Sequence, residues 1–403
     1  MNFYDHIQEL NNQLKSNQIT VAQFFHKLNI NKYFKKLPLS DEIIIFQFNA
    51  IGDSILVSSF IREVKQNNLS KKITLVCNDT SKDLFEYCPY IDKLVPIKCV
   101  NKTLPDIIQD LINTFKDNFW KYKFALALCP QWGRPNFAAS LGAYLVGAER
   151  SVGYNVNSWK TCYLNPPKFY DDPIDYDCLL TDNLYAPNNI IHNIDRKKYI
   201  LDYLQYQVNS MDLEAWLDDK DIIPLNKDKK IIILGLGGSL KSKRYPVNLL
   251  LQALMEINSS NIEFLILGDK NDIDVANFLL ANLPNVKNFV NKTTLRQSLS
   301  LVSQCDLYIG NDTAVAHMAS IYHIPTIVLN MESKDKYNDC PGHLSSVRQF
   351  YPYNTKQIII QPEHALEICQ HAHIHGGCYY DFPHCITQIK PKEIVKAFYE
   401  IEG

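Results

Sequence analysis

The chain contains 403 residues, of which 46% are hydrophobic and 21% are charged. These proportions are typical of a soluble globular protein, and the length allows two domains that each have a core. The formal net charge of −2 gives no support for nucleic-acid binding. No apolar run reaches the length of a membrane span and the N-terminus lacks the apolar region of a signal peptide, so we expect a cytoplasmic location.

Residues 1–40 carry two stripes of apolar residues at helical spacing, and Thr20 is a suitable N-cap for the second helix. The stripes are Ile7, Leu10 and Leu14, then Phe24, Phe25, Leu28 and Ile30. Lysines gather toward the end of the segment. We interpret it as a helical hairpin that packs on the following domain; binding of an acceptor or a membrane surface is the alternative hypothesis.

Residues 41–207 alternate apolar strands with helices, which predicts a parallel, doubly wound sheet. The expected strands are residues 42–48, 73–77, 94–97 and 124–129. The expected helices are residues 55–65, a segment that ends near residue 85, then 104–120 and 192–207. Residues 155–190 have little periodicity and are interpreted as an insertion or an ordered loop.

Two turns in this half follow predicted strands, which is where open α/β sheets bind ligands. Gly52 and Asp53 lie between the first strand and the first helix, and Asp53 supplies an acid there. Residues 130–136 follow the strand at 124–129 and include Trp132 and Arg134. These two side chains are candidates for contact with an acceptor sugar or phosphate, and an ordinary surface loop is the alternative.

A linker is expected at residues 208–229, and a second domain begins at Lys230. Its first strand runs into a glycine-rich turn that is followed by clustered cations. These residues are Gly235, Gly237 and Gly238, then Lys241, Lys243 and Arg244. Such a turn suits a phosphate leaving group. The elements expected next are a helix at 247–257, a strand at 263–267, a helix at 273–283, a strand at 289–290 and a helix at 294–303.

Residues 305–329 predict a short βαβ unit. Asn311 and Asp312 end its first strand, and either is a suitable N-cap for a helix over residues 313–322. The first helical amides are then expected to point outward and to bind phosphate or sugar oxygens. His317 lies one turn into this helix; a capped helix with a structural histidine is the alternative reading.

Three motifs, in this order, resemble those of glycosyltransferase family 9, the ADP-heptose:lipopolysaccharide heptosyltransferases. They are Gly52-Asp53, then Gly238-Ser239 with Lys243-Arg244-Tyr245-Pro246, then Asp312-Thr313-Ala314-Val315-Ala316-His317-Met318-Ala319. The resemblance runs from about Glu42 to the C-terminus. Ala314 stands where the family usually has glycine, Tyr245 stands where it has tryptophan, and residues 1–40 have no family counterpart.

The resemblance implies two Rossmann-like domains that face each other across a cleft, the GT-B arrangement. The expected regions are an N-terminal helical extension at 1–40, an acceptor-binding domain at 41–207, a linker at 208–229, a nucleotide-sugar-binding domain at 230–388, and a helix at 389–403 that crosses back to the first domain.

The resemblance also implies an activity, inverting transfer of a sugar to a hydroxyl. Asp53 is then the general base, kept ionised at a helix N-terminus, and Lys243 contacts the donor phosphate. The expected donor-binding residues are Gly238, Ser239, Asn271, Asp312, Thr313, Ala314 and His317. The expected acceptor-binding residues are Gly52, Trp132 and Arg134. The structural alternatives are a merely capping Asp53, a surface Lys243 and a structural His317.

The expected donor is ADP-heptose, and the expected acceptor is a bacterial glycan such as the lipopolysaccharide core or another lipid-linked glycan. No Asp-x-Asp pair at a strand end is suited to a divalent cation, so we expect metal-independent transfer. Peripheral contact with the cytoplasmic face of the inner membrane is a further hypothesis. A protein O-heptosyltransferase and a non-catalytic sugar-nucleotide-binding protein are the alternatives.

Cysteines and histidines are interleaved near the C-terminus, at spacings that fit no tight zinc signature. They are Cys369, Cys378 and Cys385 with His371, His373, His375 and His384, and Cys340 is a potential fourth ligand. The expectation is thiols and surface histidines with no cofactor, and a structural metal at the three cysteines is the alternative.

Overall fold

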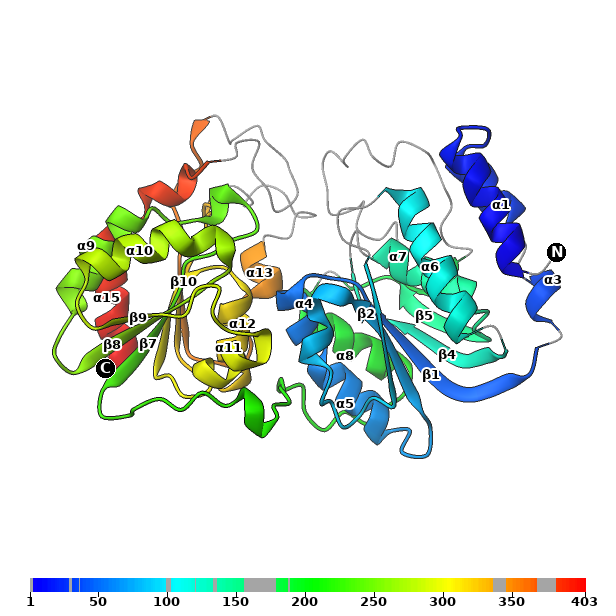
Figure 1. Ribbon diagram of the computed structural model, residues 1–403, viewed down its shortest axis with the longest axis horizontal. Coiled ribbons are helices and arrows are strands. Elements are labelled where there is room, and N and C mark those ends of the chain that lie inside the picture. Colours follow the sequence, from blue (N-terminus) through cyan, green and yellow to red (C-terminus); the bar gives the residue numbers. More distant parts are fainter. Residues whose placement is uncertain are drawn as a thin grey trace. The chain divides into compact units, whose positions relative to one another are not determined.

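The computed structural model describes residues 3–28, 31–35, 37–98, 103–119, 121–132, 136–155, 179–187, 189–335, 346–367 and 382–403. The chain divides into two compact units, Met1–Met211 and Asp212–Gly403, and each has its own sheet (Figure 1). The prediction of two doubly wound α/β domains is confirmed. Within the described ranges, no helix has the length and apolar character needed to cross a membrane.

The sheet of the first unit has the strand order β3-β2-β1-β4-β5-β6, and every pairing is parallel. The strands are β1 Leu39–Gln47, β2 Ile73–Asn78, β3 Lys93–Ile97, β4 Lys123–Cys129, β5 Arg150–Tyr154 and β6 Asp182–Leu184. The central strand β1 is buried from Ile43 onward and β2 is buried throughout, as expected for apolar strands of a sheet that is covered on both faces. The chain order places β1 and β4 side by side at the centre.

Helices cover this sheet and connect its strands. They are α4 Ile51–Ile55, α5 Ser58–Gln66, α6 Leu104–Asn118, α7 Asn136–Leu145 and α8 Asn193–Tyr203, with a 3₁₀ segment at Asp79–Leu84. The single helix expected at 55–65 is two helices, because the backbone breaks at Leu56 and Val57. Helix α7 was not predicted, since its uniformly apolar sequence shows little helical periodicity.

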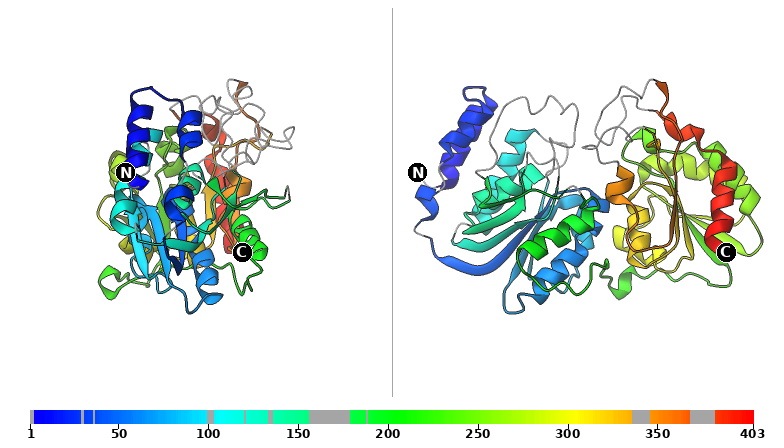
Figure 2. Two further views of the ribbon diagram at one scale, coloured as in Figure 1. Left: turned by 90° about the vertical axis from the view of Figure 1, so that its right-hand side faces the viewer. Right: turned by 180° about the vertical axis from the view of Figure 1, so that it is seen from behind.

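The N-terminal extension packs on the first unit and joins its core. Helices α1 Phe3–Lys15, α2 Val21–Lys27 and α3 Asn31–Phe34 form it, and α1 lies against α6 (Figures 1 and 2). The N-cap at Thr20 has a complete capping box with Gln23. Phe34 contacts Gly147, whose φ of +63° and lack of a side chain allow the ring to approach. The interpretation as a packed helical segment is therefore confirmed in the described residues.

The second sheet repeats the topology of the first, with the order β12-β11-β10-β7-β8-β9 and parallel pairings. Its strands are β7 Lys230–Gly235, β8 Ile262–Leu267, β9 Val286–Asn288, β10 Leu307–Asn311, β11 Thr326–Leu329 and β12 Gln357–Ile360. Strand β9 precedes the expected residues 289–290, and edge strand β12 was not predicted. As in the first unit, the first and fourth strands in chain order are neighbours.

The helices of this unit are α9 Val247–Ile257, α10 Ile273–Asn282, α11 Leu295–Val302, α12 Ala314–Ile321, α13 Ser346–Phe350 and α15 Pro391–Glu402. Short 3₁₀ turns occupy Asp219–Asp221, Lys241–Lys243, Lys270–Asp272 and Cys385–Gln388.

The expectation that residues 389–403 cross back to the first domain is wrong. Helix α15 packs against α9 and β12, and its apolar face belongs to the core of the second unit. Tyr245 also donates a hydrogen bond of 2.8 Å to the carbonyl of Ile389, at the start of this segment. The apolar face of α15 is therefore buried by its own unit.

Candidate functional site

The candidate residues lie at the points where the strand order of each sheet reverses. In the first unit, Asp53 follows β1 and Trp132 follows its neighbour β4. In the second unit, Gly237 to Lys243 follow β7 and Asp312 to Ala314 follow its neighbour β10. The carboxyl ends of strands at such a switch point are where open α/β sheets bind ligands.

The ends of β7 and β10 approach each other unusually closely. A Cβ on Gly310 would lie 2.3 Å from the carbonyl oxygen of Gly235, and a Cβ on Gly235 would lie 2.3 Å from the hydroxyl of Tyr308. That buried hydroxyl donates to the carbonyl of Asn311 at 2.5 Å and lies 3.3 Å from the Thr313 hydroxyl. Both glycines are therefore needed so that Tyr308 can support the end of β10.

Asn311 joins the two loops of this site. Its buried side-chain amide donates to the carbonyls of Leu236 and Gly237 and accepts from the amide of Tyr245 at 3.0 Å. The sequence suggested Asn311 only as a helix cap. Its actual role depends on contacts across 75 positions of sequence, and no local pattern indicates such contacts.

Lys243 and Asp312, which were expected from separate motifs, form an ion pair. The Lys243 ammonium lies 3.1 Å from Oδ2 of Asp312, and the two side chains are 18% and 16% exposed. This partly buried pair has both a cation for a phosphate and a carboxylate for hydroxyl groups. The structure therefore brings the second and third motifs together at one edge of one sheet.

Helix α12 begins one residue later than expected. Thr313 is the N-cap, and its hydroxyl accepts from the amide of Val315, so neither Asn311 nor Asp312 caps the helix. In the described part of the chain, the amides of Thr313 and Ala314 donate to no other group. The helix therefore offers two amides rather than three beside Asp312, where an anion is stabilised.

Arg244 has a structural role that sequence reasoning missed. Its guanidinium donates to the carbonyls of Gly238 and Asn271 and lies 3.0 Å from Oδ1 of Asp272. Asp272 is buried beneath Gly237 and Gly268, where any Cβ would collide with its carboxylate. Burial raises the pKa of Asp272, and Arg244 and the Asp269 amide oppose that rise. Arg244 thus joins the glycine turn to the loop that follows β8.

The other expected donor-binding residues surround this centre. Ser239 and Asn271 are exposed on the loops after β7 and β8, and Gly238 is half-buried. His317 is buried on α12 one turn beyond Ala314. Their roles in binding stay predictions.

In the first unit, Gly52 and Asp53 lie in the first turn of α4 and are half-buried. Trp132 is buried, and the Arg196 guanidinium lies 3.7 Å from the centre of its ring. One ring face of Trp132 is therefore already covered, and acceptor contact by this residue stays a prediction. Arg134 lies outside the described residues.

Two adjacent cations of α8 were also missed by sequence reasoning. Arg196 and Lys197 are each about 1% exposed, although both lie near the N-terminus of the helix. Lys197 donates a hydrogen bond to the side chain of Asn193. Burial lowers the pKa of Lys197 to about 7, while the negative charge of Asp53 opposes the decrease. A basic dipeptide on a helix is usually solvated, so the sequence contained no signal for this burial.

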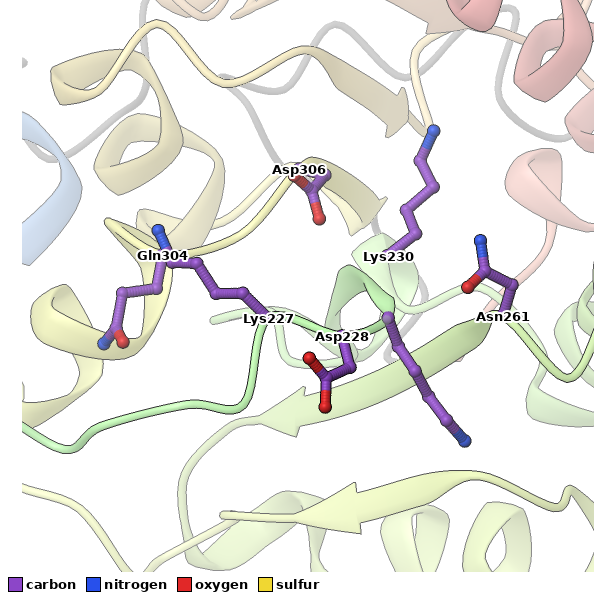
Figure 3. Close-up of a pocket in the computed structure, with 7 residues that line it drawn as sticks. Lys227, Asp228, Lys230, Asn261, Gln304 and Asp306 are labelled. Atoms are coloured by element: carbon purple, nitrogen blue, oxygen red, sulfur yellow. The ribbon is translucent and has the colours of Figure 1, made fainter.

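Two cavities lie away from the switch points. One, of about 390 Å³, is lined by residues at the amino ends of β7, β8 and β10, including Lys227, Asp228 and Asp306 (Figure 3). The other, of about 550 Å³, is lined by aromatic residues of the N-terminal extension and by α6. The first cavity is at the wrong end of its sheet to be part of the site described above.

The proposed cysteine cluster cannot be assembled from the described residues. Cys340, Cys369 and Cys378 lie outside them, as do His371, His373 and His375. Cys385 is buried beside His384, whose Nδ1 is 3.1 Å from the Cys385 sulfur. The metal hypothesis and its thiol alternative both stay predictions.

Comparisons with known proteins agree with the motif resemblance. Residues 180–372 match the profile of Glycosyltransferase family 9 (heptosyltransferase). Lipooligosaccharide heptosyltransferase 2 of Campylobacter jejuni subsp. jejuni serotype O:2 is 28% identical over 155 residues, which are 34% of this chain and 48% of that protein. The chain thus spans about half the length of this relative.

Two further proteins match over most of the chain. Lipopolysaccharide heptosyltransferase 1 of Campylobacter coli is 22% identical over 379 residues, 90% of this chain and 99% of that protein. The structure of the E. coli ADP-heptose lps heptosyltransferase II is 14% identical, covers 89% of this chain and 98% of its own, and has a TM-score of 0.61. With the three motifs, these matches show that the chain resembles glycosyltransferase family 9, and the structural match shows that it shares the fold of that solved protein.

Proposed function

We propose that this protein transfers heptose from ADP-heptose to a hydroxyl of a bacterial glycan, such as the lipopolysaccharide core, with inversion and without a divalent cation. The observation that carries the proposal is the Lys243–Asp312 pair between the glycine turn after β7 and the open amides of α12. The relatives named above are heptosyltransferases, which supports the choice of sugar.

The donor half of the reaction needs stabilisation of a diphosphate leaving group. The Lys243 ammonium and the amides of Thr313 and Ala314 supply positive charge and hydrogen-bond donors for this group. Asp312 holds Lys243 and can accept hydrogen bonds from sugar hydroxyls. These groups supply the positive charge that a bound cation provides in other transferases, which is why we propose metal-independent transfer.

The acceptor half needs a base. Asp53 takes the proton of the acceptor hydroxyl as the oxygen bonds to the anomeric carbon, and the bond from that carbon to the diphosphate breaks with its electron pair on the phosphate oxygen. One displacement of this kind inverts the configuration. We expect Asp53→Asn to lower transfer about 10²–10⁴-fold with unchanged donor binding.

The first experiment is thermal unfolding of the purified chain with ADP, UDP or GDP in the presence of EDTA. A nucleotide at 100 times its Kd should add about 2.7 kcal/mol to the free energy of unfolding. ADP should stabilise the protein, and Lys243→Ala should abolish the effect. Lys241→Ala is the matched control, because Lys241 lies on the same short turn and is exposed.

Each other outcome would change the proposal. No shift with any nucleotide would contradict transfer and favour a protein that does not bind nucleotide sugars. A shift with UDP or GDP alone would mean that the donor carries that nucleotide instead of ADP, and a shift that needs added divalent cation would contradict metal independence.

Mass spectrometry of ADP-heptose reactions with glycan or protein acceptors would then separate a glycan transferase from a protein O-heptosyltransferase. A cytoplasmic location with peripheral membrane contact stays a prediction.

A further inference from the structure

The N-terminal extension forms the wall of the cavity of about 550 Å³, which no part of the proposed reaction uses. The apolar lining consists of Phe3 and Tyr4 of α1, Tyr33 and Phe34 of α3, and Leu37. Phe3 holds this lining together, because its ring centre lies 4.6 Å from that of Phe34 and 5.5 Å from that of Tyr33. Protein interiors seldom leave voids larger than a water molecule, so a space of this size among rigid rings suits a ligand.

The cavity is also lined by a polar side chain that lacks a partner. Tyr4 is 6% exposed, and its hydroxyl forms no hydrogen bond within the part of the chain that the structure describes. Burial raises the pKa of this phenol, so the hydroxyl stays protonated and can donate. An ordered water needs about two to four polar partners, whereas the other buried side chains of the lining are phenylalanines. The interior is therefore better suited to an apolar ligand that carries a hydrogen-bond acceptor.

The mouth of the cavity is charged. Lys116 and Asp117, in the last turn of α6, are exposed lining residues whose charges offset each other. The nearby excess is positive, because Lys35 directly follows Phe34 and is exposed. Residues 20–40 contain four lysines and no acidic residue, although the whole chain has a net charge of −2. Such a local excess of lysine attracts an anionic surface.

The cavity lies at the opposite edge of the sheet from Asp53. Leu37 comes two residues before β1, and the last turn of α6 comes shortly before β4, so the cavity is near the amino ends of these strands. Asp53 follows the carboxyl end of β1, which has nine residues and spans roughly 30 Å at about 3.3 Å per residue. A ligand in the cavity is therefore held away from the reaction site and does not compete with an acceptor there.

We propose that this cavity binds one acyl chain of an anionic membrane phospholipid. The chain fills the aromatic interior, its ester carbonyl accepts a hydrogen bond from Tyr4, and its phosphate faces Lys35 and Lys116. An acyl chain already has apolar surroundings in a bilayer, so the favourable free energy comes mainly from the aromatic lining, which loses contact with water. The bound lipid holds the protein at the membrane surface, where the proposed function places a lipid-linked acceptor. The site itself needs neither Asp53 nor Lys243.

The first test uses myristoyl lysophosphatidylglycerol, kept below its micelle-forming concentration, as a soluble probe. Leu37→Trp puts a larger ring into the cavity, and Leu69→Trp is the matched control because Leu69 is 76% exposed in the same unit. Calorimetric titration of the full chain should show saturable binding to the unaltered protein and to Leu69→Trp. Binding to Leu37→Trp should be at least about tenfold weaker. Glycerol 1-phosphate, which has a phosphate but no acyl chain, should not bind at the same concentrations.

Tyr4→Phe isolates the contribution of the hydroxyl. Removing a buried hydroxyl that has no partner should leave the Tm unchanged or raise it, but should weaken binding of the probe about three- to tenfold. An ether analogue of the probe, which lacks the ester carbonyl, should bind more weakly than the ester to the unaltered protein. The two probes should bind equally to Tyr4→Phe. A merely structural tyrosine would lower the Tm on substitution and would not distinguish ester from ether.

Vesicles test the preference for an anionic headgroup. Vesicles of equal parts phosphatidylglycerol and phosphatidylcholine should sediment with the protein, and vesicles of phosphatidylcholine alone should retain much less of it. Lys35→Ala and Lys116→Ala should each weaken binding about fivefold. Lys198→Ala is the control, because Lys198 is exposed on α8 and paired with Asp202, and it should have no effect.

Probe binding that is unchanged in Leu37→Trp would overturn the inference, as would equal binding of the ester and ether probes to the unaltered protein. A dimer that Leu37→Trp converts into monomers, with no probe bound, would also overturn it and assign the cavity to a contact between two copies of the chain. If Leu37→Trp does not fold, a photoactivatable form of the probe decides with the unaltered protein. Labels on α1 and α3 support the inference, and labels elsewhere overturn it. Stabilisation by ADP, measured on the same variants, reports separately on the proposed function.

Discussion

At the scale of single residues, Arg244 shows how one charged side chain can stabilise a glycine-rich turn. We expect Arg244→Ala to lower the free energy of unfolding by about 1–3 kcal/mol at pH 7, because Asp272 then stays buried without its cation. Two hydrogen bonds to the Gly238 carbonyl are also lost. Chemical denaturation, monitored by hydrogen exchange in the second unit, measures the change in the free energy of unfolding.

The effect should depend on pH in a defined direction. Burial raises the folded-state pKa of Asp272, so the folded protein holds this proton more tightly and stability falls as pH rises through that pKa. Removing Arg244 strengthens the effect, so the loss should be smaller near pH 4 than at pH 7. The double variant Arg244→Ala/Asp272→Asn should recover most of the stability. Equal losses at both pH values would show that the ion pair contributes little.

Sequence reasoning found residues whose neighbours lie in the same motif, or at the ends of strands that the topology makes adjacent. Lys243 and Asp312 were identified for this reason. Asn311 was taken for a helix cap, while Arg244 and Lys197 received no role. The partners of Asn311 and Arg244 lie in other loops, and a motif does not show which distant carbonyl or carboxylate a side chain reaches. Lys197 bonds to Asn193 on its own helix, and its burial depends on packing that the local sequence does not show.

At the scale of elements, α15 shows that a sequence can predict a helix without predicting the element against which the helix packs. Its apolar residues were evident from their spacing, but amphipathicity identifies a buried face without identifying what covers it. The strands predicted from long apolar runs are present in the structure. Such runs belong to central strands, which are buried on both faces. Edge strands β6 and β12 have three and four residues, which is too short for a clear alternation.

We expect Ile394→Ala on α15 to destabilise the second unit by about 2–5 kcal/mol, because its side chain is fully buried in that core. Tyr399→Ala is the matched control on the same helix, since Tyr399 is 61% exposed and should change stability by less than about 0.5 kcal/mol. Urea denaturation with hydrogen exchange in α9 and β12 measures both. Faster exchange in the first unit rather than in α9 would restore the idea of a helix that crosses back.

At the scale of the whole molecule, one strand order occurs twice, and each unit has a polar site where its strand order reverses. Alternating strands and helices predicted this much, because parallel strands joined by right-handed crossovers leave few topologies. The extension at residues 1–40 has no equivalent in the second unit. Its helices nevertheless share the apolar core of the first sheet, with Ile7 and Phe24 fully buried.

This shared core predicts that the extension is required for the stability of the first unit. We expect deletion of residues 1–37 to expose the face of α6 that α1 covers, and to speed hydrogen exchange in α6, β1 and β4. Ile7→Ala should produce a smaller change in the same segments, about 2–5 kcal/mol, whereas Glu9→Ala, on the exposed side of α1, should have no effect. Stabilisation by ADP should persist in all three variants, because the Lys243 site belongs to the second unit. Unchanged exchange in α6 after the deletion would mean that the extension is an accessory, and the hypothesis of an acceptor-binding or membrane-surface role would then become the better account of its conspicuous aromatic residues.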